Sequence, residues 1–297
     1  MKKLHYTLLI LLAIYSFQAN SQDYLLDEVT REQLSAPPYS EWFQAGYDNY
    51  IPNAEILNIL RNDLASASVE LYFATWCGDS RREVPKFLKL MDELGIEKSQ
   101  IKLYALDYED GVYKQSPSKF EAGKSIYRVP TFRIMNNQKE LGRIVEYPVV
   151  SFEMDLRRIV NGEDYLPNYK SFPFINDWLE AGLLTDKTVN ITGLANSIRP
   201  MVYHWGEIYT AAKVLDDQGK SLEALALYRI NAYLFRESPS SQVMLARAYG
   251  EAGEYDKALD LYRDAWVLEP GDDDIYNELI ALVEKKAGLK LASMPDK

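Results

Sequence analysis

Apolar residues between positions 53 and 162 follow two spacings, one typical of helices and one typical of strands. The run from Val69 to Ala74 is rich in branched and aromatic residues, which predicts a strand. The apolar positions that follow recur at intervals of three and four, which predicts a helix ending at Gly95. Its expected core side chains are Val84, Phe87, Leu88, Met91 and Leu94.

Further helices are predicted on both sides of this pair. Asn53 is suited to cap a helix, and Ser151 can cap another that Gly162 ends. The apolar residues of 120–127 suggest a short helix between them, whereas residues 22–50 read as a polar and aromatic extension with a turn. The inner face of the Asn53 helix would hold Ile56, Ile59, Leu60 and Leu64.

Three more strands are predicted over 101–108, 129–135 and 140–147, and the last two are joined by a hairpin turn at 136–139. Helices precede each of the first three strands, so these strands can be parallel, while the hairpin makes the last pair antiparallel. The pattern therefore predicts one mixed α/β domain, which with its N-terminal extension covers residues 22–162.

Past a linker and helical connector over 163–204, where 171–187 looks helical, the pattern repeats with a period of 34 residues. Gly219, Ala224, Leu225 and Tyr228 match Gly253, Ala258, Leu259 and Tyr262. The small, aromatic and terminal proline positions of 253–270 resemble a tetratricopeptide unit. The resemblance implies an all-α repeat domain over 205–297, with two helix pairs and a capping helix over 274–286.

Stacked helix pairs form a concave groove, which implies that the repeats bind a client protein or peptide. The residues expected to face this groove are Tyr209, Lys213, Val243 and Arg247. The alternative is that the repeats only stabilise the first domain or mediate self-association.

The first 21 residues have the order of a secretory signal peptide, because Lys2 and Lys3 precede an apolar run and small residues follow it. The run is shorter than the roughly 20 residues that span a bilayer, so no stable membrane anchor is expected. We therefore expect a periplasmic or secreted protein whose mature chain starts near Gln22.

The net charge of −11 over 297 residues argues against binding to nucleic acid, since phosphates would be repelled. The mature chain would contain one cysteine, Cys77, and one histidine, His204, which cannot supply a disulfide framework or a zinc site. No metal or other cofactor is expected, and His204 is expected to be structural.

Cys77 lies in the stretch "FATWCGDS", between the predicted strand and helix, with Pro85 eight residues later and "RVPT" at 128–131. In this order the three motifs resemble those of thioredoxin, over roughly residues 50–162. The resemblance implies that Cys77 is a nucleophile, whose thiolate the start of the helix would stabilise. It also implies that substrate binds at Trp76 and at a cis-proline loop formed by Val129, Pro130 and Thr131.

Two positions depart from the family pattern. Ser80 replaces the second cysteine, and Leu71 replaces a buried acid. A hydroxyl cannot resolve a mixed disulfide, so exchange at Cys77 would need an external thiol donor. Ser80 could still assist by binding the thiolate, or it could only satisfy a backbone group.

Three functions are compatible with these residues. The first is monothiol disulfide exchange of the isomerase or reductase type, on protein or low-molecular-weight thiol substrates, with the repeats recruiting the client. The second is a non-catalytic adaptor that keeps the thioredoxin shape for binding. The third is a chaperone-like scaffold that uses both surfaces without redox turnover.

Overall fold

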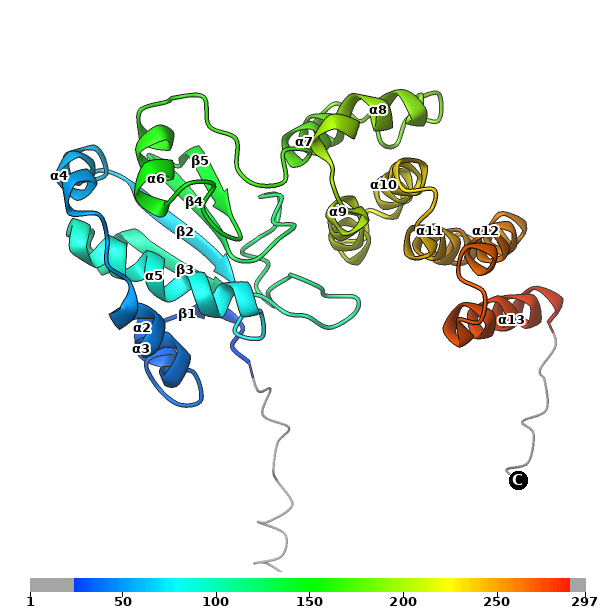
Figure 1. Cartoon of the computed structure of the whole chain (residues 1–297), viewed down its shortest axis with the longest axis horizontal. Helices are drawn as coiled ribbons and strands as arrows, with labels where there is room; N and C mark the ends of the chain where they lie inside the picture. The colour runs from blue at the N-terminus through cyan, green and yellow to red at the C-terminus, as the bar shows by residue number, and fades with distance from the viewer. Residues whose placement is uncertain (1–23, 289–297) are drawn as a thin grey trace, which may run out of the picture.

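The computed structural model describes residues 24–288, and the expected signal peptide over 1–21 lies outside them. An α/β unit forms the N-terminal side of the molecule, and an array of paired helices forms the C-terminal side (Figure 1). None of the helices in residues 24–288 combines the length and the apolar character that a membrane span requires.

A five-stranded sheet in the order β1-β3-β2-β4-β5 forms the centre of the α/β unit. Strand β2 (Ser68–Phe73) pairs in parallel with β3 (Ile101–Ala105) and antiparallel with β4 (Thr131–Asn136). The hairpin of β4 with β5 (Lys139–Val145) is confirmed, and β1 (Asp27–Val29) adds an antiparallel edge beside β3. The expectation that the first three predicted strands are parallel was therefore wrong for β4.

The physical reason lies in the long segment 106–130, which contains turns in place of the helix expected over 120–127. Lys119, Gly123 and Ser125 adopt positive φ angles of 56°, 72° and 54°, which interrupt a right-handed helix. The segment ends at the same edge of the sheet at which β3 ends, where Thr131 pairs with Tyr72, so β4 runs antiparallel to β2.

The two faces of the sheet are covered in different ways. On one face, Leu71 and Phe73 of β2 join a core with residues of α5 (Gly78–Leu94) and α6 (Phe152–Val160). On the other face, Tyr72 joins a smaller core with residues of the segment 106–130. The turn-rich segment therefore covers this face of the sheet in place of a helix, and its side chains pack there against Tyr72.

The predicted helix starts and ends in this unit are confirmed. Asn53 caps α4 (Ala54–Asp63) and Ser151 caps α6, while Gly95 ends α5 with a φ of 79°. The inner face predicted for α4 was wrong at Ile59, which is 50% exposed, because Leu57 occupies the core instead.

The extension before α4 is more structured than its composition suggested. It contains β1, α2 (Arg31–Leu34) and α3 (Ser40–Asn49), and α3 packs on α5. The approach is close, because a Cβ added at Gly46 would lie 2.5 Å from Cγ of Pro85.

Seven helices follow the linker in the described part of the chain. The first two are α7 (Phe172–Glu180) and α8 (Ile191–Ile198), of which only α7 was expected. The two helix pairs of the predicted repeats and the capping helix are confirmed as α9 (Trp205–Asp217), α10 (Ser221–Leu234), α11 (Pro239–Glu251), α12 (Tyr255–Leu268) and α13 (Asp273–Ala287). Two short 3₁₀ helices, η1 (Lys98–Gln100) and η2 (Arg199–Met201), complete the elements.

The helix array has its own apolar core, in which α7 and α8 pack with α9 and α10. Tyr127, from the segment before β4, belongs to this core, so the α/β unit and the helices share a packed boundary. Matching glycines end the first helix of each pair, since Gly219 and Gly253 have φ angles of 77° and 78°.

Candidate functional site

Cys77 occupies the N-cap position of α5, where its backbone is extended and its side chain makes no capping hydrogen bond. The thiol is free and half-buried. Its Sγ lies 3.3 Å from the carbonyl oxygen of Val129, to which the thiol donates. The Val129–Pro130 peptide bond is cis, so the predicted meeting of the cysteine with a cis-proline loop is confirmed.

The other residues expected at this site, Trp76, Pro130 and Thr131, differ in whether their polar groups are free to contact a ligand. The indole Nε1 of Trp76 donates to Leu106 O at 2.9 Å, which fixes the ring beside the site. Pro130 is buried, and the Thr131 hydroxyl donates to Arg128 O at 2.7 Å. Thr131 therefore shapes the loop with its hydroxyl and does not present it to a ligand.

Ser80 is fully buried, and its Oγ accepts a hydrogen bond from the Ala74 N–H at 3.1 Å. The hydroxyl thus ties the start of α5 to the end of β2. Of the two roles considered for Ser80, satisfying a backbone group is the one that the geometry displays.

Two arginines at the start of α5, Arg81 and Arg82, have different partners. Arg82 pairs with Asp79 at 2.5 Å and with Glu83 at 2.7 Å, and Nε of Arg81 donates to Thr75 O at 2.6 Å. Arg82 is therefore paired with carboxylates, whereas Arg81 keeps its positive charge and is held by a backbone carbonyl.

Sequence reasoning missed a buried lysine beside this loop, Lys114, in the segment between β3 and β4. This lysine is only 3% exposed, and its Nζ donates to Tyr127 O at 3.0 Å. The pKa of Lys114 is lowered to about 7, chiefly by burial and also by the positive charge of Arg128, against the smaller opposing effects of Glu146 and Cys77. No periodic signal marks the position, because its burial arises from the fold of a turn-rich segment.

Arg128 and Glu146 complete the charged surroundings of the loop. Nη1 of Arg128 lies 3.5 Å from Oε1 of Glu146, and Nη2 donates to Gly206 O at 2.6 Å. The hydroxyl of Tyr169 also donates to Glu146. Arg128, next to Val129, therefore joins the Cys77 site to the first turn of α9.

A second connection runs through Asp217 at the end of α9. One of its carboxylate oxygens accepts from the backbone N–H groups of Gly111 at 3.1 Å and Tyr113 at 2.9 Å. The ring of Tyr113 lies beside that of Trp76, with centroids 6.3 Å apart. Side chains next to Cys77 thus contact the same short segment that docks on the repeats.

The four residues predicted to face the groove lie in three different environments. Tyr209 and Arg247 line a surface pocket of about 550 Å³, and Arg247 is paired with Glu278. Lys213 also lines it but pairs with Asp217 at 2.7 Å, as part of the contact with the α/β unit. The expectation for Val243 was wrong, because its side chain is only 5% exposed. Val243 lies on α11 and packs in a core with residues of α12 and α13.

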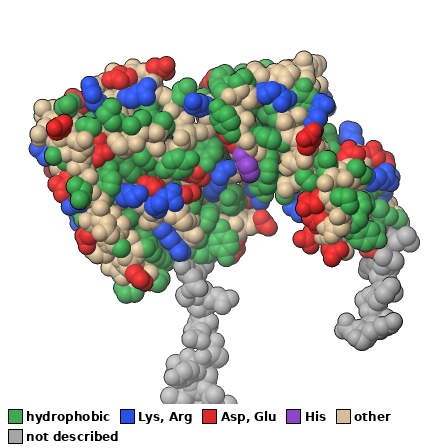
Figure 2. All heavy atoms as spheres, in the orientation of Figure 1, with side chains coloured by type: hydrophobic (Ala, Val, Ile, Leu, Met, Phe, Trp, Pro, Cys, Tyr) green, Lys and Arg blue, Asp and Glu red, His purple; other side chains and the backbone are tan. Residues whose placement is uncertain are grey.

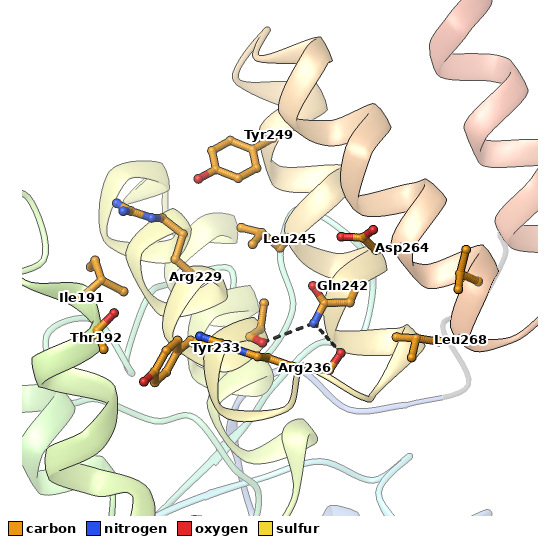
Figure 3. Close-up of a pocket in the computed structure, with 12 residues that line it drawn as sticks. Ile191, Thr192, Arg229, Tyr233, Arg236, Gln242, Leu245, Tyr249, Asp264 and Leu268 are labelled. Carbon is orange, nitrogen blue, oxygen red and sulfur yellow. Dashed lines mark hydrogen bonds between the residues drawn. The ribbon is translucent and has the colours of Figure 1, made fainter.

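A separate surface pocket of about 570 Å³ lies among α8, α10, α11 and α12. Figure 3 shows Arg229, Arg236 and Tyr249 around it, with Gln242 donating to backbone carbonyls at the end of α10. None of the predicted groove residues lines this pocket.

On the face drawn in Figure 2, basic and acidic side chains are mixed over both units, unlike the continuous basic surface of a nucleic-acid-binding protein. Among residues 24–288, no three His, Cys, Asp or Glu side chains gather as ligands for a metal ion. His204 caps α9, with Nδ1 accepting from the Gly206 N–H at 3.0 Å.

Comparison with known proteins identifies part of the helix array. A family model described as tetratricopeptide repeat matches residues 239–282, which cover α11, α12 and most of α13. A search of curated proteins finds no match to the chain. The C-terminal region thus contains a tetratricopeptide repeat, a unit that typically binds protein partners through stacked helix pairs.

Proposed function

We propose that this chain is an exported, thioredoxin-like protein that performs thiol–disulfide exchange with Cys77, and that its repeats recruit the client. The observation that carries the proposal is the position of the Cys77 sulfur, at the start of α5 and 3.3 Å from Val129 O in a cis-proline loop. The motifs at Cys77 and Pro130 support it, since Cys77 and Val129 are 52 residues apart in sequence and meet at the sulfur.

The chemistry has two exchange steps. The Cys77 thiolate attacks one sulfur of a client disulfide, forming a mixed disulfide and releasing the other client sulfur as a thiolate. The thiolate of an external low-molecular-weight thiol then attacks the client sulfur of the mixed disulfide, forming a new S–S bond to the client and releasing Cys77 as its thiolate. This second reactant is required because Ser80 cannot act as a resolving thiol, and its hydroxyl is engaged with Ala74.

The position of the repeats beside the α/β unit supports this scheme. The pocket lined by Tyr209 and Arg247 is also lined by Asp110 and Gly111, which belong to the segment that reaches the Cys77 site. A client segment held in this pocket would therefore lie next to the α/β unit, on the side where Tyr113 approaches Trp76.

Trapping of mixed disulfides tests the proposal. The full chain, signal included, is expressed in a bacterial host, thiol exchange is stopped with acid, and adducts are separated without reductant. We expect reductant-sensitive adducts with the wild-type chain, none with Cys77→Ala, and fewer with Ser80→Cys because a resolving thiol releases the client. The idea fails if the wild-type chain forms no adducts and Cys77 is alkylated no faster than a free cysteine.

A non-catalytic adaptor is the second candidate, and two observations favour it. The repeat match supports protein binding by itself, and the Ser80 hydroxyl contacts backbone and not the sulfur. Client capture that is equally tight for Cys77→Ser and wild type would select the adaptor. Export belongs to both proposals and is tested by finding the mature chain, starting at Gln22, in the periplasm or medium.

A further inference from the structure

The pocket of about 570 Å³ among α8, α10, α11 and α12 is a separate cavity of the helix array, and it shares no lining residue with the groove pocket of Tyr209 and Arg247. Cavities of this size bind ligands as large as a few amino-acid residues. Charged, amide and apolar side chains meet in it (Figure 3). Each kind of side chain sets one requirement for a ligand.

Three arginines lie around Tyr233 at this pocket. The guanidinium carbon of Arg236 lies 4.5 Å from the centre of the Tyr233 ring, and that of Arg199, in η2, lies 5.5 Å from it. Arg229 lines the pocket one turn before Tyr233 on α10. All three arginines are exposed, and within residues 24–288 none of them has a carboxylate at ion-pair distance. The first requirement is therefore an anion.

The composition of the chain makes this lack of partners informative. The chain has 44 Asp and Glu residues against 33 Lys and Arg, so acids that could pair with these arginines are plentiful. Asp264 is the acidic residue that lines the pocket, and it too forms no ion pair with another described residue. Like charges gathered around one ring repel one another, and a bound carboxylate, which arginine contacts through two parallel hydrogen bonds, offsets that repulsion.

Gln242 adds a hydrogen-bond acceptor to the pocket. Its Nε2 donates to the carbonyl oxygens of Ala232, Phe235 and Arg236 at 3.2, 3.4 and 3.3 Å, which fixes the orientation of the amide. The amide oxygen points the other way, toward Leu245 in Figure 3, and accepts no hydrogen bond from the described residues. Since Gln242 is only 7% exposed, an acceptor held in this way favours a ligand that supplies an N–H group.

Apolar side chains set the third requirement. Val267 and Leu268, at the end of α12, line the pocket and are 73% and 41% exposed. Large apolar side chains that lie together at the rim of a pocket favour contact with an apolar part of a ligand. A small dicarboxylate or a phosphate ion would satisfy the arginines but neither Gln242 nor this apolar wall. An acidic peptide meets all three requirements.

We propose that this pocket binds an acidic peptide segment of a partner protein. Asp or Glu side chains of the peptide pair with Arg229 and Arg236, and one of its backbone N–H groups donates to Oε1 of Gln242. An apolar side chain of the peptide packs on Val267 and Leu268. Because the two pockets share no lining residue, a partner bound here leaves the groove pocket free, and the inference does not depend on thiol exchange at Cys77.

Fluorescence anisotropy on the mature chain tests the proposal with a labelled nine-residue peptide. The probe carries Asp and Glu residues with one Leu and one Phe, and a neutral counterpart has Asn and Gln in place of the acids. At about 0.15 M salt, where distant charges are screened, we expect the acidic probe to bind roughly tenfold more tightly than the neutral one. Arg229→Gln and Arg236→Gln should each weaken its binding roughly fivefold.

Two further variants separate the charge of the pocket from general effects. Asp264→Asn removes a like charge and should tighten binding of the acidic probe roughly twofold, a gain that loss of structure does not produce. Arg263→Gln is the matched control, because Arg263 lies on α12, pairs with Asp260 and does not line the pocket. This control should bind the probe as wild type does.

Four outcomes would overturn the inference. The first is an acidic probe that binds no better than the neutral one, and the second is wild-type affinity in both Arg229→Gln and Arg236→Gln. The third is loss of binding only in Arg247→Gln, which would place the peptide in the groove pocket. The fourth is displacement of the probe by glutarate or inorganic phosphate as effectively as by unlabelled peptide, because the site would then recognise a small anion. Thermal melting shows whether each variant is folded, and Asp264→Asn retains a test if an arginine variant is not.

Discussion

Replacing Lys114 with methionine should change how the stability of the protein depends on pH. Methionine keeps an unbranched apolar stem and removes the ammonium group. Burial lowers the pKa of Lys114 from 10.5 to about 7. Below pH 7 both the folded and the unfolded chain hold the proton, so the folded state bears the full unfavourable energy of the buried charge. The difference between 10.5 and about 7 corresponds to about 5 kcal/mol, at about 1.4 kcal/mol per pH unit.

The sign of the effect follows from proton binding. Between pH 7 and pH 10.5 the folded chain has largely released this proton while the unfolded chain still binds it, so stability rises with pH. From about pH 7 to about pH 9 the wild type should therefore gain about 2 kcal/mol relative to Lys114→Met. The lost hydrogen bond to Tyr127 O alters the absolute stability of the variant, but it does not alter this dependence on pH.

Urea unfolding followed by tryptophan fluorescence, at pH 7 and pH 9, measures the difference. Comparing the two chains at each pH cancels the contribution of the tyrosines and carboxylates that they share. Lys119→Met should show the wild-type dependence, because this side chain is exposed. A wild type and a Lys114→Met variant whose stabilities change in parallel between the two pH values would refute the reasoning.

Three more substitutions test the packing around the candidate site. Gly46→Ala should destabilise the α/β unit by about 1–3 kcal/mol despite the better helix propensity of alanine, because the new Cβ would meet the rigid ring of Pro85; an unchanged urea midpoint would contradict this. Ser80→Ala should cost about 1–3 kcal/mol by leaving the Ala74 N–H without its acceptor, yet leave the alkylation rate of Cys77 unchanged. Asp217→Ala should release the segment docked on α9, so amide hydrogen exchange at positions 111 and 113 should accelerate roughly tenfold; protection equal to wild type would argue that other contacts hold the segment.

Much of the secondary structure could be predicted from local sequence. Caps such as Asn53 and Ser151 satisfy free backbone N–H groups within one turn, and the β4–β5 hairpin forms between neighbouring residues. The 34-residue period predicted the helix pairs because each repeat is stabilised mainly by its immediate neighbours. These features depend on residues close in sequence, so periodicity and capping chemistry are enough to find them.

The site was predictable only where a motif marked it. Cys77 and Pro130 carry recognisable signals, and the structure brings the sulfur to the carbonyl of Val129. Val243 was misplaced because helical periodicity shows that a position is apolar but does not show whether a neighbouring helix covers it. Lys114 gave no signal, since a lysine in a polar segment is expected to face water.

By itself, the sequence determined the order of elements, the repeat period and the cysteine at a helix start, all of which follow from local spacing and capping. Only the tertiary structure decided the direction of β4, the docking of residues 110–115 on α9 and the burial of Lys114. Each of these depends on segments that meet across long separations in sequence. Burial of a charge, above all, is a property of the whole packed neighbourhood and not of the residue that carries it.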